Sequence, residues 1–178
     1  MNNKEFFIKS WQHEAAVTAK AIRALPSDIG KLTVQHHPSF RSPWELVNHM
    51  GPHGKECAQA ATEGRMDLVN EGHFPLTGPT IYRSTEDAAK SVEDHSARLV
   101  EALNKVDDQT WDSKVIPVYW GPNKIFEMPL GTLCWTMHND TIHHRGQLTS
   151  YYRTLGVKQP NLYGPTLEEE EAMMAKSN

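Results

Sequence analysis

The feature that most constrains the fold of this chain is a long helical repeat near its C-terminal end. Apolar residues recur three or four positions apart from Leu130 to Leu155, and Gly156 follows as a helix stop. A helix of this length is stable in water only when its apolar face packs against other parts of the chain. The repeat therefore predicts a helical domain in which this segment is a principal helix.

Two side chains bring polar chemistry into this repeat. Asp140 and His144 are four residues apart, so they lie one above the other on a single helix face. His144 also takes a position where the repeat calls for an apolar residue, and burying an imidazole without a partner costs roughly 1–3 kcal/mol. We interpret the pair in one of two ways: as half of a divalent-metal site, or as a hydrogen-bonded pair buried without a metal.

Three further helices are predicted upstream, and their ranges are about 4–25, 42–64 and 84–106. The second has a clear start, because Ser42 and Glu45 have the spacing of a capping box around Pro43. Gly51-Pro52 falls inside this helix, where a kink or local bulge is expected. Together with the last helix, these segments predict an all-α fold.

The segments between the helices refine this prediction. β-branched and aromatic residues at 115–126 flank a Gly-Pro-Asn turn, which is typical of a short β-hairpin, and Pro117 would confine that hairpin to an edge. Residues from about 65 to 83 form a long crossover rich in Gly and Pro, as in four-helix bundles that are not simply up-down-up-down. We expect residues 1–178 to form a single bundle domain with a polar, acidic tail from about residue 166.

Composition excludes several classes of partner. The formal net charge is −4 and the Lys and Arg residues are scattered, which argues against nucleic-acid binding. No apolar run approaches the roughly 20 residues of a membrane span, and the N-terminal residues lack the apolar core of a signal peptide. We therefore expect a cytoplasmic protein with no membrane partner, in which Cys57 and Cys134 are free thiols.

A third metal ligand would come from the second helix. His49 is the best candidate, because it lies beside Met50 on the apolar face, and His53 is the fallback one turn further on. Glu56 is a candidate hydrogen-bond acceptor or proton carrier, although a surface acid is its simpler interpretation. His95 also falls on the apolar stripe of its own helix, where a structural role is the simpler interpretation.

Other residues of the last helix receive supporting roles. His143 points roughly 100° away from His144, along a more polar face, where Gln147 can hold it by a hydrogen bond. Arg145 is most simply a salt-bridging or interface residue, and Gly146 in mid-helix suggests close packing by another helix. The remaining histidines are interpreted as surface or loop residues, namely His13, His36, His37, His73 and His138.

Three segments carry a family resemblance: the run Asp140-Thr-Ile-His-His-Arg-Gly-Gln-Leu-Thr-Ser-Tyr-Tyr-Arg153, the run Tyr163-Gly164-Pro165 and the run Trp44-Glu-Leu-Val-Asn-His49-Met. In these segments the chain resembles the DinB-like (damage-inducible, YfiT-type) family of metalloenzymes. It implies a four-helix bundle of up-down-down-up topology with a divalent metal, zinc or nickel, at His49, Asp140 and His144. Many members have histidine where this chain has Asp140, which departs from the common pattern.

The resemblance also implies a class of function. Its members include thiol-dependent S-transferases and isomerases, so we expect a metal-dependent transferase or hydrolase acting on a small molecule, with a low-molecular-weight thiol as cosubstrate. His143, His53 and Glu56 are the candidate proton carriers. The alternative is a non-catalytic helical interaction module whose metal site is structural or vestigial. A homodimer is expected in either case.

Overall fold

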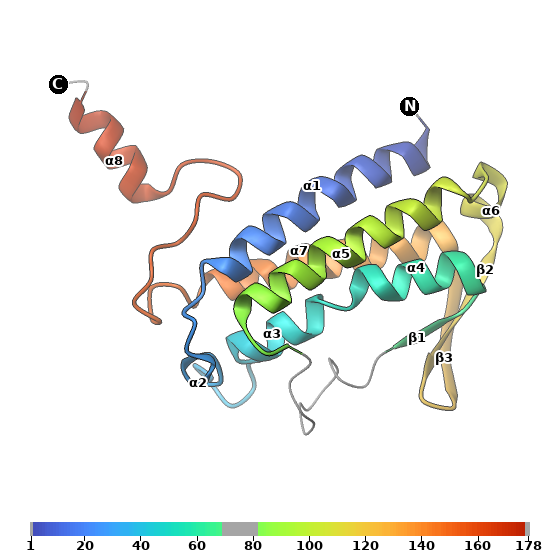
Figure 1. Cartoon of the computed structure of the whole chain (residues 1–178), viewed down its shortest axis with the longest axis horizontal. Helices are drawn as coiled ribbons and strands as arrows, with labels where there is room; N and C mark the ends of the chain where they lie inside the picture. Colours follow the sequence, from blue (N-terminus) through green and yellow to red (C-terminus); the bar gives the residue numbers. More distant parts are fainter. Residues whose placement is uncertain (1, 69–81, 177–178) are drawn as a thin grey trace.

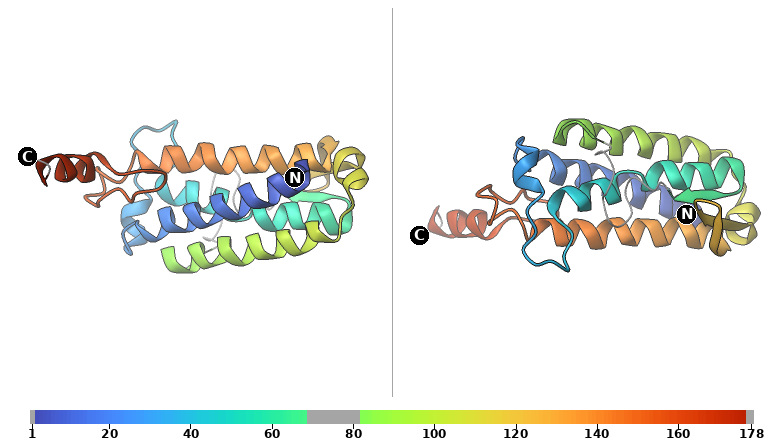
Figure 2. Two further views of the ribbon diagram at one scale, coloured as in Figure 1. Left: turned by 90° about the horizontal axis from the view of Figure 1, so that it is seen from above. Right: turned by 90° about the horizontal axis from the view of Figure 1, so that it is seen from below.

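The structure is a computed structural model that describes residues 2–68 and 82–176. The chain is mostly helical and carries a small three-stranded sheet (Figure 1). Its elements, in order, are α1 Asn3–Arg23, α2 Ile29–Leu32, α3 Pro43–Met50, α4 His53–Glu63, β1 Met66–Leu68, α5 Thr85–Asn104, α6 Asp108–Ser113, β2 Val115–Trp120, β3 Asn123–Pro129, α7 Leu130–Thr149 and α8 Leu167–Lys176. The long helices α1, α5 and α7 and the shorter α3 and α4 lie side by side, with the sheet and α6 at one end (Figures 1 and 2).

Local capping signals explain where the long helices begin. The Ser42 side chain accepts a hydrogen bond from the Glu45 backbone amide and Glu45 reaches back to the Ser42 amide, so the predicted capping box is present at the start of α3. Asn2 and Glu5 form the same box at the start of α1. The predicted second helix is divided at Gly51 and Pro52 into α3 and α4, which confirms the expected break.

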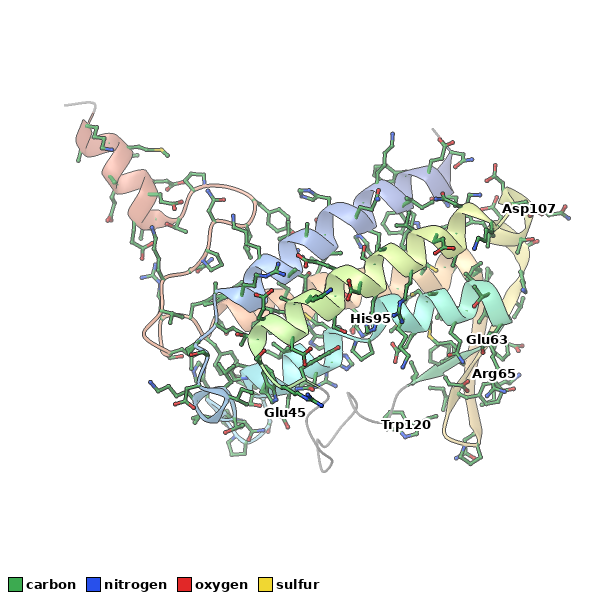
Figure 3. All side chains as sticks on the ribbon, viewed as in Figure 1. Glu45, Glu63, Arg65, His95, Asp107 and Trp120 are labelled. Carbon is green, nitrogen blue, oxygen red and sulfur yellow. The ribbon has the colours of Figure 1, made fainter. Side chains whose placement is uncertain are left out.

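The break between α3 and α4 is held from the side by α5. His95 Nδ1 lies 3.0 Å from the Gly51 carbonyl oxygen, and Figure 3 shows His95 beside the junction of the two helices. A Cβ at residue 51 would come within 2.7 Å of ring atoms of Tyr82. A larger residue at this position would therefore require the Tyr82 ring to move.

The sheet shows that the all-α prediction is incomplete. The expected hairpin is present as β2 and β3, but Met66–Leu68 also pairs in parallel with β2, with Met66 opposite Val118, so the strand order is β1-β2-β3. The prediction that Pro117 confines the hairpin to an edge is wrong, because β2 is the central strand. Pro117 is nevertheless tolerated, since the pairing with β1 begins one residue later, at Val118.

Two other predicted boundaries changed. The last helix ends at Thr149 and not at Leu155, because the amides of Ser150 and Tyr151 bond to carbonyls three residues back, and Gly156 later takes a positive φ of 71°. The acidic tail contains α8, which stands apart from the other helices in Figure 1 and has no buried residue. Most of the predicted crossover at 65–83 lies outside the described residues. None of the described helices has the length and apolar character needed to cross a membrane.

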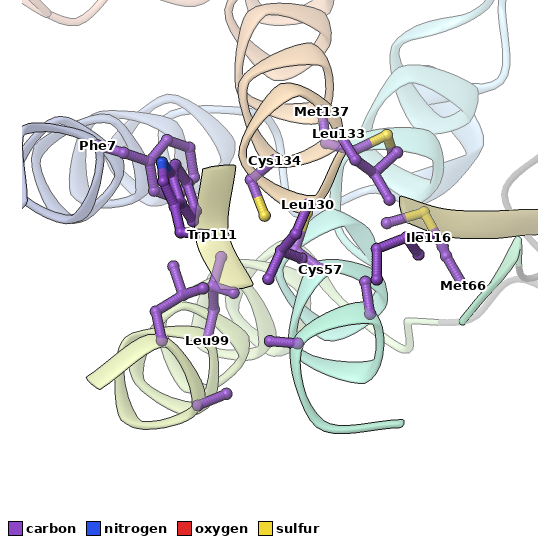
Figure 4. Close-up of a cluster of buried hydrophobic side chains, with 14 of the residues drawn as sticks. Phe7, Cys57, Met66, Leu99, Trp111, Ile116, Leu130, Leu133, Cys134 and Met137 are labelled. Atoms are coloured by element: carbon purple, nitrogen blue, oxygen red, sulfur yellow. The ribbon is translucent and has the colours of Figure 1, made fainter. Parts of the chain in front are cut away.

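The core consists of two apolar clusters separated along the helix axes. One surrounds the sheet end and includes Phe7, Leu99, Trp111 and Leu133 (Figure 4). The other occupies the opposite end, near α2 and α3. Buried polar side chains occur on α1, α3, α4, α5 and α7, and those of α4, α5 and α7 fall between residues of the two clusters; the set is Thr18, His49, His53, Glu56, Ser96, His138, Thr141 and Arg145. We call this group of buried polar side chains the polar layer.

Candidate metal centre

The three predicted metal ligands meet in this polar layer. His49, Asp140 and His144 each offer one donor atom, and these atoms all lie within 4.8 Å of one another. His49 Nε2 is 3.0 Å from Asp140 Oδ2, and His144 Nε2 is 3.3 Å from Asp140 Oδ1. Two imidazoles and one carboxylate brought together from α3 and α7 form a group that could hold a metal ion.

The charge states of the group suit a metal site. Burial opposes ionisation of Asp140, but hydrogen bonds from His144 and His49 outweigh it and keep the pKa of this carboxyl well below its usual range. Burial also lowers the pKa of the His49 imidazole, despite its contact with Asp140. An ionised carboxylate and a neutral imidazole are the forms that bind a divalent metal, because a ligand must first lose its proton.

Gln147 orients the ring of His144. The Gln147 amide oxygen lies 2.7 Å from His144 Nδ1 and accepts a hydrogen bond from it. The other ring nitrogen, Nε2, faces the carboxylate and lies 3.3 Å from Asp140 Oδ1. The predicted bond from Gln147 to His143 is also present, with 3.1 Å between the two nitrogens.

His53 faces the same carboxylate from α4. Thr141 donates its hydroxyl proton to the Met137 carbonyl oxygen at 2.9 Å, so its oxygen accepts from His53 Nδ1 at 2.8 Å. The other nitrogen of His53, Nε2, faces Asp140 Oδ2, which lies 3.5 Å away. The fallback ligand is thus buried beside the three-residue group, with its ring held by Thr141.

Several predictions about neighbouring residues are corrected. Glu56 is buried, with 2% exposure, so its interpretation as a surface acid is wrong. His138, expected on the surface, is also buried, because it packs against the rings of Phe7 and Trp135 in the polar layer. A Cβ at Gly146 would meet no described atom within 4 Å, so the expected close packing there is wrong.

The other histidines follow the sequence more closely. His143 is exposed, as its face of α7 predicts, and its ring lies 4.9 Å from that of His144. His13, His36 and His37 are exposed, as expected, while His73 lies outside the described residues. The candidate proton carriers are therefore placed differently: His143 is open to solvent, whereas His53 and Glu56 are enclosed.

The sequence indicated only a general salt-bridging or interface role for Arg145, but this residue anchors the polar layer. Its guanidinium pairs with Glu14, donates to Thr18 Oγ1 at 2.8 Å, and contacts the hydroxyl of Tyr163. The Arg145 side chain is only 2% exposed, so a buried ion pair joins α1 to α7, and the hydrogen bond to Tyr163 adds the segment after α7. No local signal could have found this pairing, because Glu14 lies 131 residues away.

A cleft opens beside the three-residue group. It has a volume of about 360 Å³ and is lined by Ser39, Phe40, Arg41, Leu46, His144, Gln147, Ser150 and Tyr151. His144 therefore belongs both to the candidate metal group and to the wall of the cleft. A molecule in this cleft would contact the His144 side of the site.

Comparisons with known proteins agree with this architecture. The DinB family model matches residues 1–175. The protein YrdA of Bacillus subtilis strain 168 is 28% identical over 169 residues, which cover 93% of this chain and 90% of YrdA. Among solved structures, a DinB-like protein from Bacillus cereus superposes with a TM-score of 0.63 at 24% identity, over 89% of this chain and 97% of that protein.

A second solved structure shows the same fold. The DinB-like protein YjoA of Bacillus subtilis superposes with a TM-score of 0.60 at 16% identity, over 89% of this chain and 99% of YjoA. Together, the fold and the group of His49, Asp140 and His144 define a mostly helical protein with side chains that could hold a metal ion. The chain belongs to the DinB family, as its sequence resemblance indicated.

Proposed function

We propose that this protein is a divalent-metal-dependent enzyme that acts on a small molecule, and that His49, Asp140 and His144 hold its metal. The observation that carries the proposal is that one donor atom each of His49, Asp140 and His144 lie within 4.8 Å of one another. A divalent cation at this point would be bound by the ionised carboxylate and by the two imidazoles once they are unprotonated. Zinc or nickel suits a donor set of two imidazoles and one carboxylate.

The chemistry we propose is thiol transfer, with hydrolysis as the second form. A divalent metal with three protein ligands lowers the pKa of a bound thiol or water, which makes a nucleophile available near neutral pH. His53 lies 3.5 Å from Asp140, within the polar layer, and would accept or return a proton there. The adjoining cleft would admit the electrophile beside His144.

The fold and assembly complete the proposal. In Figure 1, α1 and α7 run in one direction while α3, α4 and α5 run in the other, which supports an up-down-down-up four-helix bundle. We propose that residues 1–178 form one such domain, and that it works as a homodimer in the cytoplasm. Size-exclusion chromatography with light scattering tests the dimer.

A metal titration coupled to a thiol assay tests the function. Purified protein is titrated with zinc and with nickel, and is then assayed with cysteine and monobromobimane. In this reaction a sulfur–carbon bond forms, the carbon–bromine bond breaks, bromide leaves and the thiol proton passes to solvent. We expect one metal per chain and a rate above the uncatalysed reaction, both of them lost in His49→Ala and His144→Ala.

The same experiment separates the competing interpretations. Stoichiometric metal in the wild type with no acceleration of thiol transfer or ester hydrolysis would favour the non-catalytic interaction module. Failure of the wild type to bind zinc or nickel would favour the hydrogen-bonded pair without a metal. His143→Ala is the matched control, because His143 neighbours His144 in sequence but is exposed, and it is expected to keep its metal.

A further inference from the structure

The cleft beside His144 has the volume of a small-molecule binding site. Its two walls come from residues 39–46, at the entry to α3, and from residues 144–151, at the end of α7. A volume of about 360 Å³ matches the lower end of the roughly 300–1,000 Å³ typical of small-molecule sites. The cleft is therefore large enough for a ligand of modest size that reaches His144.

Arg41 gives the cleft its charge. It is the one lining residue with a permanent charge among those described, and its Nη1 lies 3.5 Å from His144 Nε2. The backbone at this position is anchored, because the Tyr151 hydroxyl donates to the Arg41 carbonyl oxygen at 2.7 Å. The guanidinium has five donors in a fixed fork that matches carboxylates and phosphates, so it can add an anionic ligand to the contacts that it already makes.

The rest of the lining is apolar or aromatic. Phe40, which precedes Arg41 in the sequence, is 58% exposed. Leu46 and Tyr151, in contrast, are buried. The Tyr151 ring is held in place by His36, whose ring stacks on it with 3.9 Å between centroids. Burying an exposed aromatic face against a ligand is favourable because it removes apolar surface from water.

We propose that this cleft binds an acidic small molecule, whose carboxylate or phosphate pairs with Arg41 and whose apolar part covers Phe40, with the reacting atom beside His144. The assignment rests on the proposed function for the reaction at His144, but the anion contact itself does not require a metal. This assignment restricts the proposed substrate to small molecules that carry both an anionic group and an apolar portion.

Binding of three matched probes tests this assignment. Phenylacetate, phenyl phosphate and the neutral 2-phenylacetamide are titrated by calorimetry into the zinc-free and the zinc-loaded protein. We expect both anions to bind in both states and the amide to bind about 10- to 100-fold more weakly, since a hydrogen bond to a charged group contributes about 1.5–3 kcal/mol. The tighter of the two anions identifies the carboxylate or the phosphate as the group recognised.

Substitutions locate the contact. Arg41→Gln is expected to weaken phenylacetate binding by about 10- to 100-fold in both metal states. Arg153→Gln is the matched control, since Arg153 is an exposed arginine paired with Glu168 outside the lining of the cleft, and it should bind as the wild type does. Phe40→Ala should weaken phenylacetate but not acetate, which has no ring. Arg41→Lys gives a second variant if Arg41→Gln does not fold.

The outcomes separate this inference from the proposed function. Equal affinity for the amide and the anions, unchanged affinity in Arg41→Gln, or no binding of any probe by the wild type would each overturn the anion assignment, even with zinc bound stoichiometrically. Conversely, Arg41-dependent binding by a protein that takes up no zinc or nickel would support the anion site while the proposed metal chemistry fails.

Discussion

His49 Nε2 lies 3.0 Å from Asp140 Oδ2, which joins α3 to the middle of α7 across 91 residues of chain. α3 ends at Met50, one residue after His49, and beyond the break α4 presents His53 to the same carboxylate. One aspartate therefore meets imidazoles from three helices. That convergence underlies the proposed metal site.

The contact between His144 and Gln147 gives a first prediction. Gln147→Leu removes the oxygen that lies 2.7 Å from His144 Nδ1, and loss of such a supporting contact typically weakens metal affinity about 10- to 100-fold. Calorimetric titration with zinc measures the change. His143→Ala, which removes the other partner of Gln147, is the control and should stay within about threefold of the wild type.

A result in which Gln147→Leu binds zinc as tightly as the wild type would show that the ring of His144 is oriented by other contacts. Equal losses in Gln147→Leu and His143→Ala would instead point to the Gln147–His143 bond as the important one.

The buried ion pair between Arg145 and Glu14 gives a second prediction. Glu14→Ala leaves the Arg145 guanidinium buried without its carboxylate, and breaking a buried pair in this way costs about 3–5 kcal/mol. Thr18 continues to accept from Arg145, so we expect the lower end of this range. Urea denaturation measures the free energy of unfolding.

An exposed ion pair provides the comparison. Arg153 and Glu168 are 65% and 47% exposed, and Glu168→Ala should change the free energy of unfolding by less than about 1 kcal/mol. Similar losses in Glu14→Ala and Glu168→Ala would contradict the role given to the buried pair.

Two glycines of α7 are predicted to respond in opposite directions. Gly146→Ala should stabilise the protein by roughly 0.5–1 kcal/mol, because the new methyl meets no described atom within 4 Å and alanine favours the helix. Gly131→Ala should destabilise it by about 1–3 kcal/mol, since its Cβ would come within 2.7 Å of the Trp111 ring. Thermal unfolding measures both, and the same sign for the two variants would refute the packing described here.

Burial of His95 predicts a dependence of stability on pH. Burial lowers the pKa of this imidazole, although its bond to the Gly51 carbonyl opposes the shift and the nearby Arg98 and Lys55 add to it. The unfolded chain therefore binds the proton more readily, and the contribution of the neutral ring, present above about pH 6.5, is lost as the pH falls toward the folded pKa. His95→Asn should show a smaller fall in urea midpoint between pH 7 and pH 5 than the wild type. An equal or larger fall would contradict it.

Local signals predicted the helices and the three residues of the candidate site. The capping box at Ser42 and Glu45 marked the start of α3, and the spacing of Asp140 and His144 placed both on one face of α7. Such features depend on a few neighbouring residues, so they can be read without knowing the tertiary structure.

Features that depend on distant partners were missed. Met66–Leu68 is too short to signal a strand by itself and forms one only because β2 lies beside it. The burial of Glu56 and His138 depends on the polar layer between the two apolar clusters, which exists only when the helices are assembled. The sequence pattern at His138 contains no sign that the rings of Phe7 and Trp135 will cover it.

Anomalous scattering from a zinc-soaked crystal tests the central claim most directly. Data collected above and below the zinc absorption edge locate the ion without reference to the protein atoms. We predict one peak at about 2.0–2.2 Å from a ring nitrogen of His49, a carboxylate oxygen of Asp140 and a ring nitrogen of His144. A zinc peak bound elsewhere, with none at these three side chains, would contradict the proposed metal centre.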